Sequence, residues 1–148
     1  MLRVAGKKKA IAVLLKSNEA VDEVELQQRL ASPSDQRLMA VFRALELGWT
    51  RERIGELTKI DPWFMAQFSE MVELSRTASL VGYRSLSLEM LRDLKRAGFG
   101  DEALGEILDV KAHVVTDKRL EDSLVPSYKR IDTCAGEFES FTPYLYGT

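Results

Sequence analysis

Apolar positions recur along most of this chain at the spacing of an α-helix, and period-two alternation of β-branched residues is scarce. Ser34 or Asp35 can cap the first clear helix, and Gly48 can end it. Its expected buried face follows the i, i+3, i+4, i+7 pattern and consists of Leu38, Val41, Phe42 and Leu45. The pattern therefore predicts an all-α chain.

Two more helices follow this one. Thr50 can cap a short helix in which Ile54 and Leu57 face inward, although Arg53 stands where a Glu would complete a capping box. Asp61-Pro62 is a typical helix start, because Asp accepts free backbone N–H groups and Pro has none to satisfy. The apolar residues of this third helix cover more than one face, so we expect them to contact the second half of the domain or a partner chain: Trp63, Phe64, Met65, Phe68, Met71 and Val72.

The three-helix pattern repeats after a shift of 50 positions. In this register Gly48 meets Gly98, and Trp49 meets Phe99. Apolar positions also match, which predicts a duplicated unit. We expect units at about 34–80 and 84–124, packed as two small helical subdomains and linked at 81–85. Trp49 and Phe99 should be equivalent core anchors, since each follows a Gly that ends a helix.

The two ends of the chain differ from this helical domain, which we place at 23–125. Residues 1–22 form an extension of unclear origin. Residues 126–148 form an aromatic-rich arm that lacks helical periodicity, apart from one possible turn at 134–138. A buried aromatic ring contributes about 1.5–3 kcal/mol, so we expect the mostly irregular arm to dock onto a neighbouring domain. The alternative is an arm that folds back to complete the local core.

Composition argues against several other classes of protein. The chain has 148 residues, a formal net charge of -2 and one cysteine, so no intramolecular disulfide can form. These features fit a reducing cytoplasm. The apolar run at 10–15 follows three lysines, but it is too short to span a bilayer and no signal-cleavage pattern follows.

We predict no catalytic, cofactor-binding or metal-binding residues. Neither a G-x-G-x-x-G nor a Walker A phosphate loop occurs. His113 could join Asp109 and Asp117 in a metal site if all three share a helix face, but a solvated charged face is the favoured interpretation. Cys134 has no base nearby in the sequence, so packing as a small hydrophobe is favoured over nucleophilic catalysis with His113.

The alternative function is a small helix-turn-helix regulator that binds DNA. In such readers the third helix carries polar or basic side chains into the major groove. The helix that starts at Asp61 is instead apolar and acidic up to Arg76. The second unit has four basic or titratable candidates, opposed by four acidic residues: Lys111, His113, Lys118 and Arg119 against Asp109, Asp117, Glu121 and Asp122. The charge balance therefore disfavours DNA binding.

Three segments carry a family resemblance. They are Leu57–Phe64 (LTKIDPWF), Leu94–Phe99 (LKRAGF) and Tyr128–Phe138 (YKRIDTCAGEF), the last followed by Thr142-Pro143-Tyr144. In order and spacing they resemble the central oligomerisation (connection) domain of the large chain of carbamoyl-phosphate synthase. The likeness runs from about Leu26 to the C-terminus. Gly136 stands where Ala is usual in the family, and Ser127 where Val is usual.

The resemblance implies a non-catalytic scaffold. In that family the domain joins two ATP-grasp halves, which hold the catalytic, metal and nucleotide residues. The parent enzyme makes carbamoyl phosphate from bicarbonate, glutamine-derived ammonia and ATP, for arginine and pyrimidine biosynthesis. ATP and Mg²⁺ are thus implied only for the parent, and this chain itself should hold no cofactor.

The partners follow from the same resemblance. They are the flanking ATP-grasp halves, further copies of the large chain through self-association and, only through the parent complex, the glutaminase small chain. Nucleic acid and membrane are not expected partners. The arm would lead towards the following ATP-grasp half. The expected interface or docking residues are Trp63, Phe64, Phe68, Tyr128, Lys129, Arg130, Asp132, Cys134, Glu137 and Phe138.

Overall fold

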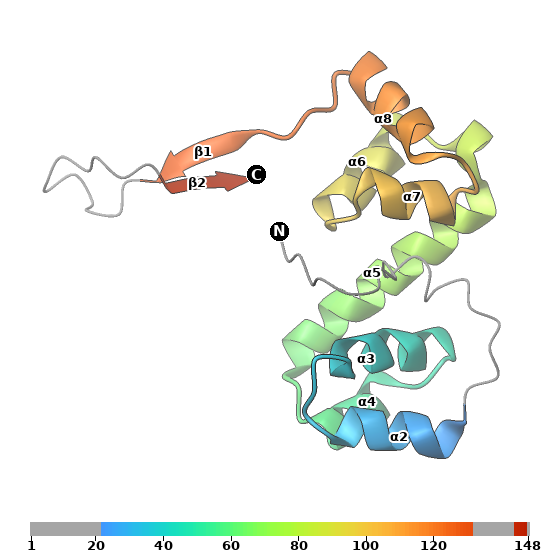
Figure 1. The fold of residues 1–148 in the computed structure, drawn as a ribbon, viewed down its shortest axis with the longest axis vertical. Helices are drawn as coiled ribbons and strands as arrows, with labels where there is room; N and C mark the ends of the chain where they lie inside the picture. Colours follow the sequence, from blue (N-terminus) through green and yellow to red (C-terminus); the bar gives the residue numbers. More distant parts are fainter. Residues whose placement is uncertain (1–21, 132–143, 148) are drawn as a thin grey trace, which may run out of the picture.

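The computed structural model describes residues 22–131 and 144–147 (Figure 1). Helices dominate this part of the chain, which confirms the all-α prediction. In chain order the elements are α2 (Glu23–Ala31), α3 (Arg37–Glu46), α4 (Arg51–Thr58), α5 (Pro62–Val81), the 3₁₀ turn η1 (Tyr83–Ser85), α6 (Leu88–Arg96), α7 (Asp101–Ile107), α8 (Ala112–Glu121), β1 (Tyr128–Ile131) and β2 (Tyr144–Gly147).

The first unit consists of α2, α3, α4 and the N-terminal part of α5. Its core includes the fully buried side chains of Leu30, Phe42, Ile54 and Met65. The guanidinium of Arg37 joins two helix ends, because Nε donates to the Leu30 carbonyl at 2.7 Å and Nη2 donates to the Thr58 carbonyl at 2.9 Å. These are carbonyls that a helix end leaves without an intrahelical partner. Arg37 therefore fastens α2 against α4.

The second unit consists of α6, α7, α8 and the C-terminal part of α5. Its core is separate from the first and includes Leu91, Leu94, Leu104 and Val115. Helices α7 and α8 make the most extensive contact between any two described helices. Each unit thus encloses its own apolar centre.

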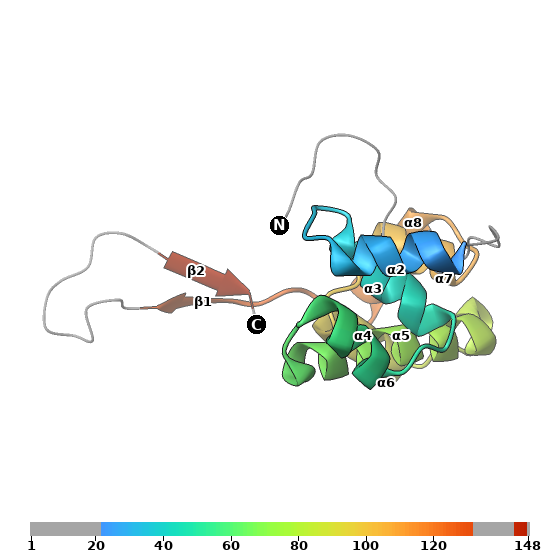
Figure 2. The same cartoon turned by 90° about the horizontal axis from the view of Figure 1, so that it is seen from below.

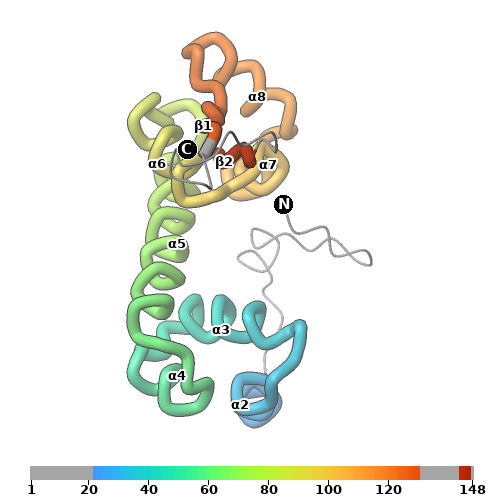
Figure 3. Tube along the Cα trace, turned by 90° about the vertical axis from the view of Figure 1, so that its left-hand side faces the viewer, coloured from blue at the N-terminus to red at the C-terminus, as the bar shows by residue number. Residues whose placement is uncertain are grey.

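The long helix α5 belongs to both units. Met65 and Val72 lie in the first core, whereas Ala78 lies in the second. Its 20 residues rise about 30 Å, so one helix spans the distance between the cores. In Figure 1 the first unit lies below α5 and the second unit lies above it, and Figure 3 shows α5 running the length between them. The helix is therefore the element that holds the two halves together.

The 50-residue spacing of the sequence pattern reappears in the helix boundaries. Helices α4 and α7 begin at Arg51 and Asp101, and α5 and α8 begin at Pro62 and Ala112. The turns before α4 and α7 also match. Gly48 and Gly98 have φ of 83° and 95°, and the following N–H groups of Trp49 and Phe99 donate to Ala44 and Leu94 at 3.0 and 3.1 Å. Helices α3 and α6 thus both end in a Schellman turn, where Gly avoids the steric cost of positive φ.

Several local predictions are confirmed, and others need correction. The side chains of Thr50 and Asp61 cap α4 and α5 as expected. Helix α3, however, begins after Gln36 without a side-chain cap, so neither Ser34 nor Asp35 caps it. Leu38 is 41% exposed because it lies in the first turn of α3 and points away from the core formed by the later turns. The observed buried face of α3 therefore begins at Ala40 and not at Leu38.

The two predicted anchors are not equally buried. Phe99 is buried in the second core. Trp49 is only partly buried, and the Arg53 guanidinium lies 3.5 Å from its ring centroid. This cation–π contact covers a ring face that the first core leaves uncovered. The two positions are thus similar in backbone and different in burial.

The arm differs from the irregular segment that the sequence predicts. Its described ends form an antiparallel ladder in which Lys129 pairs with Tyr146 and Arg130 with Leu145. The hairpin stands apart from the helical units in two perpendicular views (Figures 1 and 2). The expected helical turn at 134–138 lies outside the described residues.

Candidate interaction surfaces

The start of α5 is fixed by a short run of local hydrogen bonds. The Thr58 hydroxyl donates to the Ile54 carbonyl at 2.8 Å and accepts from the Ile60 N–H at 3.2 Å. Lys59 then adopts the left-handed region with φ of 58°. The Asp61 carboxylate accepts from the Trp63 N–H at 2.8 Å. The segment from Thr58 to Trp63 thereby sets where α5 begins and where its first rings lie.

Those first rings form an exposed aromatic surface. Trp63 is 63% exposed and Phe64 is 50% exposed. Their rings meet edge to face at 5.0 Å between centroids. Phe64 then stacks on Phe68 at 6.5 Å, and Phe68 contacts the buried Phe42 at 5.3 Å. We call Trp63, Phe64 and Phe68 the α5 aromatic surface; its rings are held in place by a chain of contacts that reaches the core.

The exposed rings can be compared with the prediction that the apolar residues of α5 contact the second half of the domain or a partner chain. Met65 and Val72 are buried in the first core, whereas Trp63 and Phe64 remain exposed. The second unit therefore does not cover these two rings, and of the two expected contacts only the partner chain is left. That contact stays a prediction.

A groove lies between α5 and α6, at the junction of the two units. It has a volume of about 440 Å³, and its apolar lining comes from Met71, Leu74 and Ala97. Its polar lining comes from Gln67 and Glu70 of α5 and from Asp93 and Arg96 of α6. The sequence analysis missed this groove, because its walls come from two helices, α5 and α6, whose relative placement no local pattern reports. We call it the α5/α6 groove.

The hairpin presents a second exposed set of large side chains. Tyr128, Tyr144, Leu145 and Tyr146 are all exposed. The ladder places Lys129 directly opposite Tyr146, so one face of the hairpin carries both charge and aromatic area. Tyr128, Lys129 and Arg130 lie together on β1, far from the N-terminal end of α5 (Figure 1). The other predicted docking residues, Asp132, Cys134, Glu137 and Phe138, lie outside the described part of the chain.

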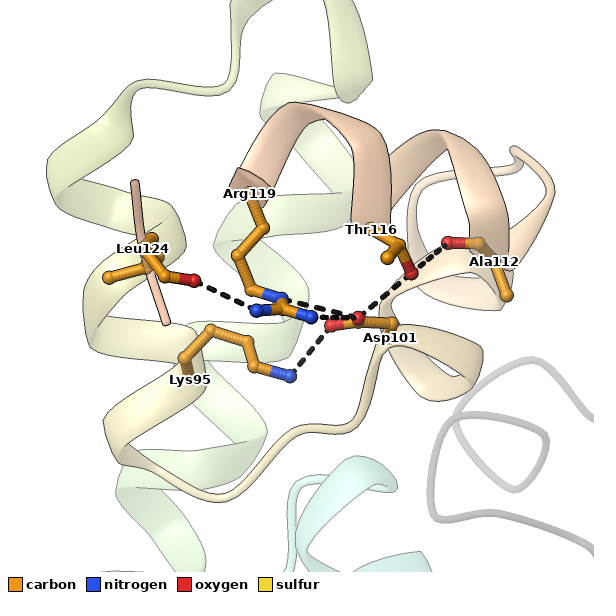
Figure 4. Close-up of polar contacts among 6 residues, drawn as sticks. All are labelled: Lys95, Asp101, Ala112, Thr116, Arg119 and Leu124. Carbon is orange, nitrogen blue, oxygen red and sulfur yellow. Dashed lines mark hydrogen bonds and ion pairs between the residues drawn. The ribbon is translucent and has the colours of Figure 1, made fainter. Parts of the chain in front are cut away.

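A polar cluster around Asp101 fastens the second unit (Figure 4). Its carboxylate accepts from Lys95 Nζ at 2.7 Å, from the Thr116 hydroxyl at 2.9 Å and from Arg119 Nη2 at 3.2 Å. Arg119 Nη1 also donates to the Leu124 carbonyl at 2.9 Å. The cluster thus links α6, α7 and α8 to the chain that leaves for the hairpin.

Two opposing effects set the charge state of this carboxyl. Burial on its own would raise the pKa of Asp101, but the hydrogen bonds from Lys95, Thr116 and Arg119 together outweigh burial. The pKa of Asp101 therefore lies below its ordinary value of 3.8. The acceptor oxygens of Asp101 are bonded to side chains of α6 and α8, so the carboxylate holds these helices against α7.

The considered metal site needs one geometric correction. His113 and Asp117 lie on α8, but Asp109 lies in the preceding turn with φ of 57°. The three residues therefore do not share a helix face. Among the described residues, no group of three or more His, Cys, Asp or Glu is placed to hold a metal ion. Within residues 22–131 and 144–147, no helix has the length and apolar character needed to cross a membrane.

The chain has two small helical units that share helix α5, and aromatic rings of α5 are exposed. These features define a helical interaction module. Residues 5–123 match the family model described as carbamoyl-phosphate synthetase large chain, oligomerisation domain. The chain belongs to this family, which confirms the resemblance found in its sequence segments. The match includes most of the N-terminal segment that the sequence analysis set apart.

Curated relatives agree with the family match. Over 127 residues the chain is 41% identical to the carbamoyl phosphate synthase large chain of Neisseria meningitidis serogroup A, which covers 86% of this chain and 12% of the relative. It is also 41% identical over 128 residues to that of Thermomicrobium roseum, again 86% of this chain and 12% of the relative. The large chain, N-terminal section, of Aquifex aeolicus is 38% identical over 128 residues, which is 86% of this chain and 22% of the relative. The matches give no support to the DNA-binding alternative.

Proposed function

We propose that this chain is the non-catalytic structural and oligomerisation module of a carbamoyl-phosphate synthase large chain. It spans only a small part of the length of its relatives, and in this proposal the catalytic activity belongs to the rest of the large chain. In this proposal the parent enzyme makes carbamoyl phosphate from bicarbonate, glutamine-derived ammonia and ATP in the cytoplasm, for arginine and pyrimidine biosynthesis. ATP and Mg²⁺ act in the ATP-grasp halves, and the module itself binds neither.

The observation that carries self-association is the exposure of Trp63 and Phe64. Large aromatic side chains are the residues that most often dominate binding energy at protein interfaces. Because Phe64 is stacked on Phe68 and so linked to the core, little conformational entropy is lost when the surface is covered. Burial of the α5 aromatic surface against a partner protein is therefore more favourable than its exposure to water.

The hairpin serves the second part of the proposed role, contact with a flanking ATP-grasp half. A two-stranded hairpin with four-residue strands is marginally stable alone in water. Docking of its exposed tyrosines onto a neighbouring domain would remove apolar area from water. Lys129 adds a positive charge that can pair with acidic groups on that domain.

Sedimentation velocity over a wide concentration range tests self-association. We expect the wild-type chain to form dimers, and the double variant Trp63→Ser, Phe64→Ser to have a dissociation constant raised by about 100-fold, which corresponds to roughly 3 kcal/mol of lost apolar burial. The matched control is Leu80→Ser, Leu120→Ser, because both leucines are exposed on other parts of the helical surface. A wild-type chain that stays monomeric at millimolar concentration would overturn the proposal.

A further inference from the structure

We infer that two copies of this chain pair through antiparallel α5 helices, with Trp63 of each copy seated in the α5/α6 groove of the other. This inference rests on the proposed self-association and specifies its geometry. The occupant of the groove is a second copy because one chain carries both parts of the contact, an exposed ring and a groove with one apolar wall, and because the matched family is an oligomerisation domain.

The ring and the groove lie on one face of α5. At about 100° per residue, Trp63, Gln67, Glu70 and Leu74 fall within a narrow stripe, with Met71 at its edge. Gln67, Glu70, Met71 and Leu74 line the groove. The stripe turns away from the first core, where Met65 and Val72 point. A partner helix laid along it meets the ring first and the groove about two turns later.

The spacing fixes the register of the pair. In an antiparallel pair of identical helices centred on Gln67, position 63 of one helix lies opposite position 71 of the other, because the two numbers are equally distant from 67. Trp63 of each copy then lies beside Met71 of its partner, at the apolar lining of the groove. The contact is isologous, so it closes after two copies and does not grow into a filament.

The chemistry of the groove suits an indole ring. Met71, Leu74 and Ala97 supply apolar contact, and methionine sulfur packs favourably against aromatic rings. Arg96, at the rim, can place its guanidinium over the indole face, where cation–π attraction is strongest for Trp. The volume of about 440 Å³ falls within the roughly 300–1,000 Å³ of pockets that hold small organic groups.

The two-fold axis of this pair falls on an uncharged residue. Gln67 is exposed and would meet its own copy. An amide has both donors and an acceptor, so two glutamines can hydrogen-bond to each other across the axis. A charged residue at this place would meet a like charge and oppose pairing. The side chain on the axis is thus compatible with self-contact.

Disulfide trapping tests this register, with Cys134→Ser as the background because Cys134 is the only cysteine. In that background Gln67→Cys should form a disulfide-linked dimer under mild oxidation, since the two side chains meet at the axis. The matched control is Thr77→Cys, also exposed on α5. Its two copies would lie 20 residues apart along the pair, about 30 Å, beyond the reach of a disulfide. It should stay unlinked.

Filling the groove provides a second, independent test by sedimentation velocity. Ala97→Phe should raise the dimer dissociation constant at least 10-fold, while Trp63→Phe should weaken pairing less than Trp63→Ala. Circular dichroism of each variant checks that the helices remain. Dimers that form normally but neither cross-link at position 67 nor respond to Ala97→Phe would overturn this register and leave the proposed function intact. A monomeric wild-type chain would overturn both.

Discussion

Two glycines at equivalent positions of the two units have different surroundings. A Cβ on Gly105 would lie 2.8 Å from the Val110 carbonyl oxygen and 3.1 Å from the Ala112 nitrogen, whereas a Cβ on Gly55 would meet no atom within 4 Å. The difference comes from the turn that follows. The Val110 N–H donates to the Gly105 carbonyl at 2.8 Å, which draws the turn across α7. In the first unit the Thr58 hydroxyl takes the equivalent N–H instead.

This contrast predicts opposite effects of one substitution. Gly105→Ala should destabilise the chain by about 1–3 kcal/mol, because the new methyl group presses on backbone atoms that cannot move independently. Gly55→Ala should be neutral or stabilising by up to about 1 kcal/mol, since Ala is the better helix former and the site has room. Urea unfolding followed by circular dichroism measures both. Equal effects at the two positions would contradict the packing described for Gly105.

At the scale of the elements, the two units are joined internally by different means. In the second unit the Asp101 carboxylate holds α6, α7 and α8 through Lys95, Thr116 and Arg119. In the first unit the Arg37 guanidinium holds the ends of α2 and α4. Arg76 of α5 adds a second tie, because Nη2 donates to the Glu46 carbonyl at the end of α3 at 2.7 Å. Similar backbones are thus fastened by unrelated polar contacts.

The Asp101 cluster predicts a pH-dependent effect. At pH 7, Asp101→Asn should lose about 1–3 kcal/mol, the typical contribution of hydrogen bonds to a charged group. The folded-state pKa of Asp101 lies below 3.8, so its contribution is fully present above that pH and is lost as pH falls through the lower, folded-state value. The gap between wild type and variant should therefore shrink below pH 3.8. Urea unfolding at pH 7 and at pH 3 measures it.

The matched control for this experiment is Glu25→Gln. Glu25 pairs with Arg29 at 2.6 Å, but both side chains are more than half exposed. An exposed i,i+4 pair contributes only about 0.3–0.5 kcal/mol, so this variant should stay close to wild type at both pH values. A gap for Asp101→Asn that is constant with pH would show that lost packing, and not lost charge, is the cause.

On the scale of the whole molecule, stability depends on one helix that enters both cores. Met65 and Val72 of α5 are buried in the first core and Ala78 in the second. Between them, α5 is exposed at several positions, among them Glu73. The cooperativity of the two units should therefore depend on the continuity of this helix.

A proline in the middle of α5 tests this dependence. Glu73→Pro removes one helical hydrogen bond and clashes with the preceding turn, which costs about 3 kcal/mol or more. We expect thermal unfolding, followed by circular dichroism, to become biphasic as the two cores separate. Glu73→Ala removes only the exposed ion pair with Arg76 at 2.9 Å and should change stability by less than about 0.5 kcal/mol. Single-step unfolding of the proline variant would show that direct contacts between the units suffice.

The sequence alone determined those features that depend on neighbours within one or two helical turns. Helix identity follows from apolar spacing, and Thr50, Asp61, Gly48 and Gly98 mark their helix ends as predicted, because capping and left-handed turns are local. The segments that carry the family resemblance also indicated the family correctly.

Tertiary structure decided what depends on residues far apart in the chain. The exposure of Leu38 and the partial burial of Trp49 depend on which elements cover them. The hairpin escaped prediction because its four-residue strands are too short to show alternation and become strands only by pairing across 12 intervening residues, 132–143. The α5/α6 groove exists only where α6 packs beside α5, so no single segment of the sequence encodes it.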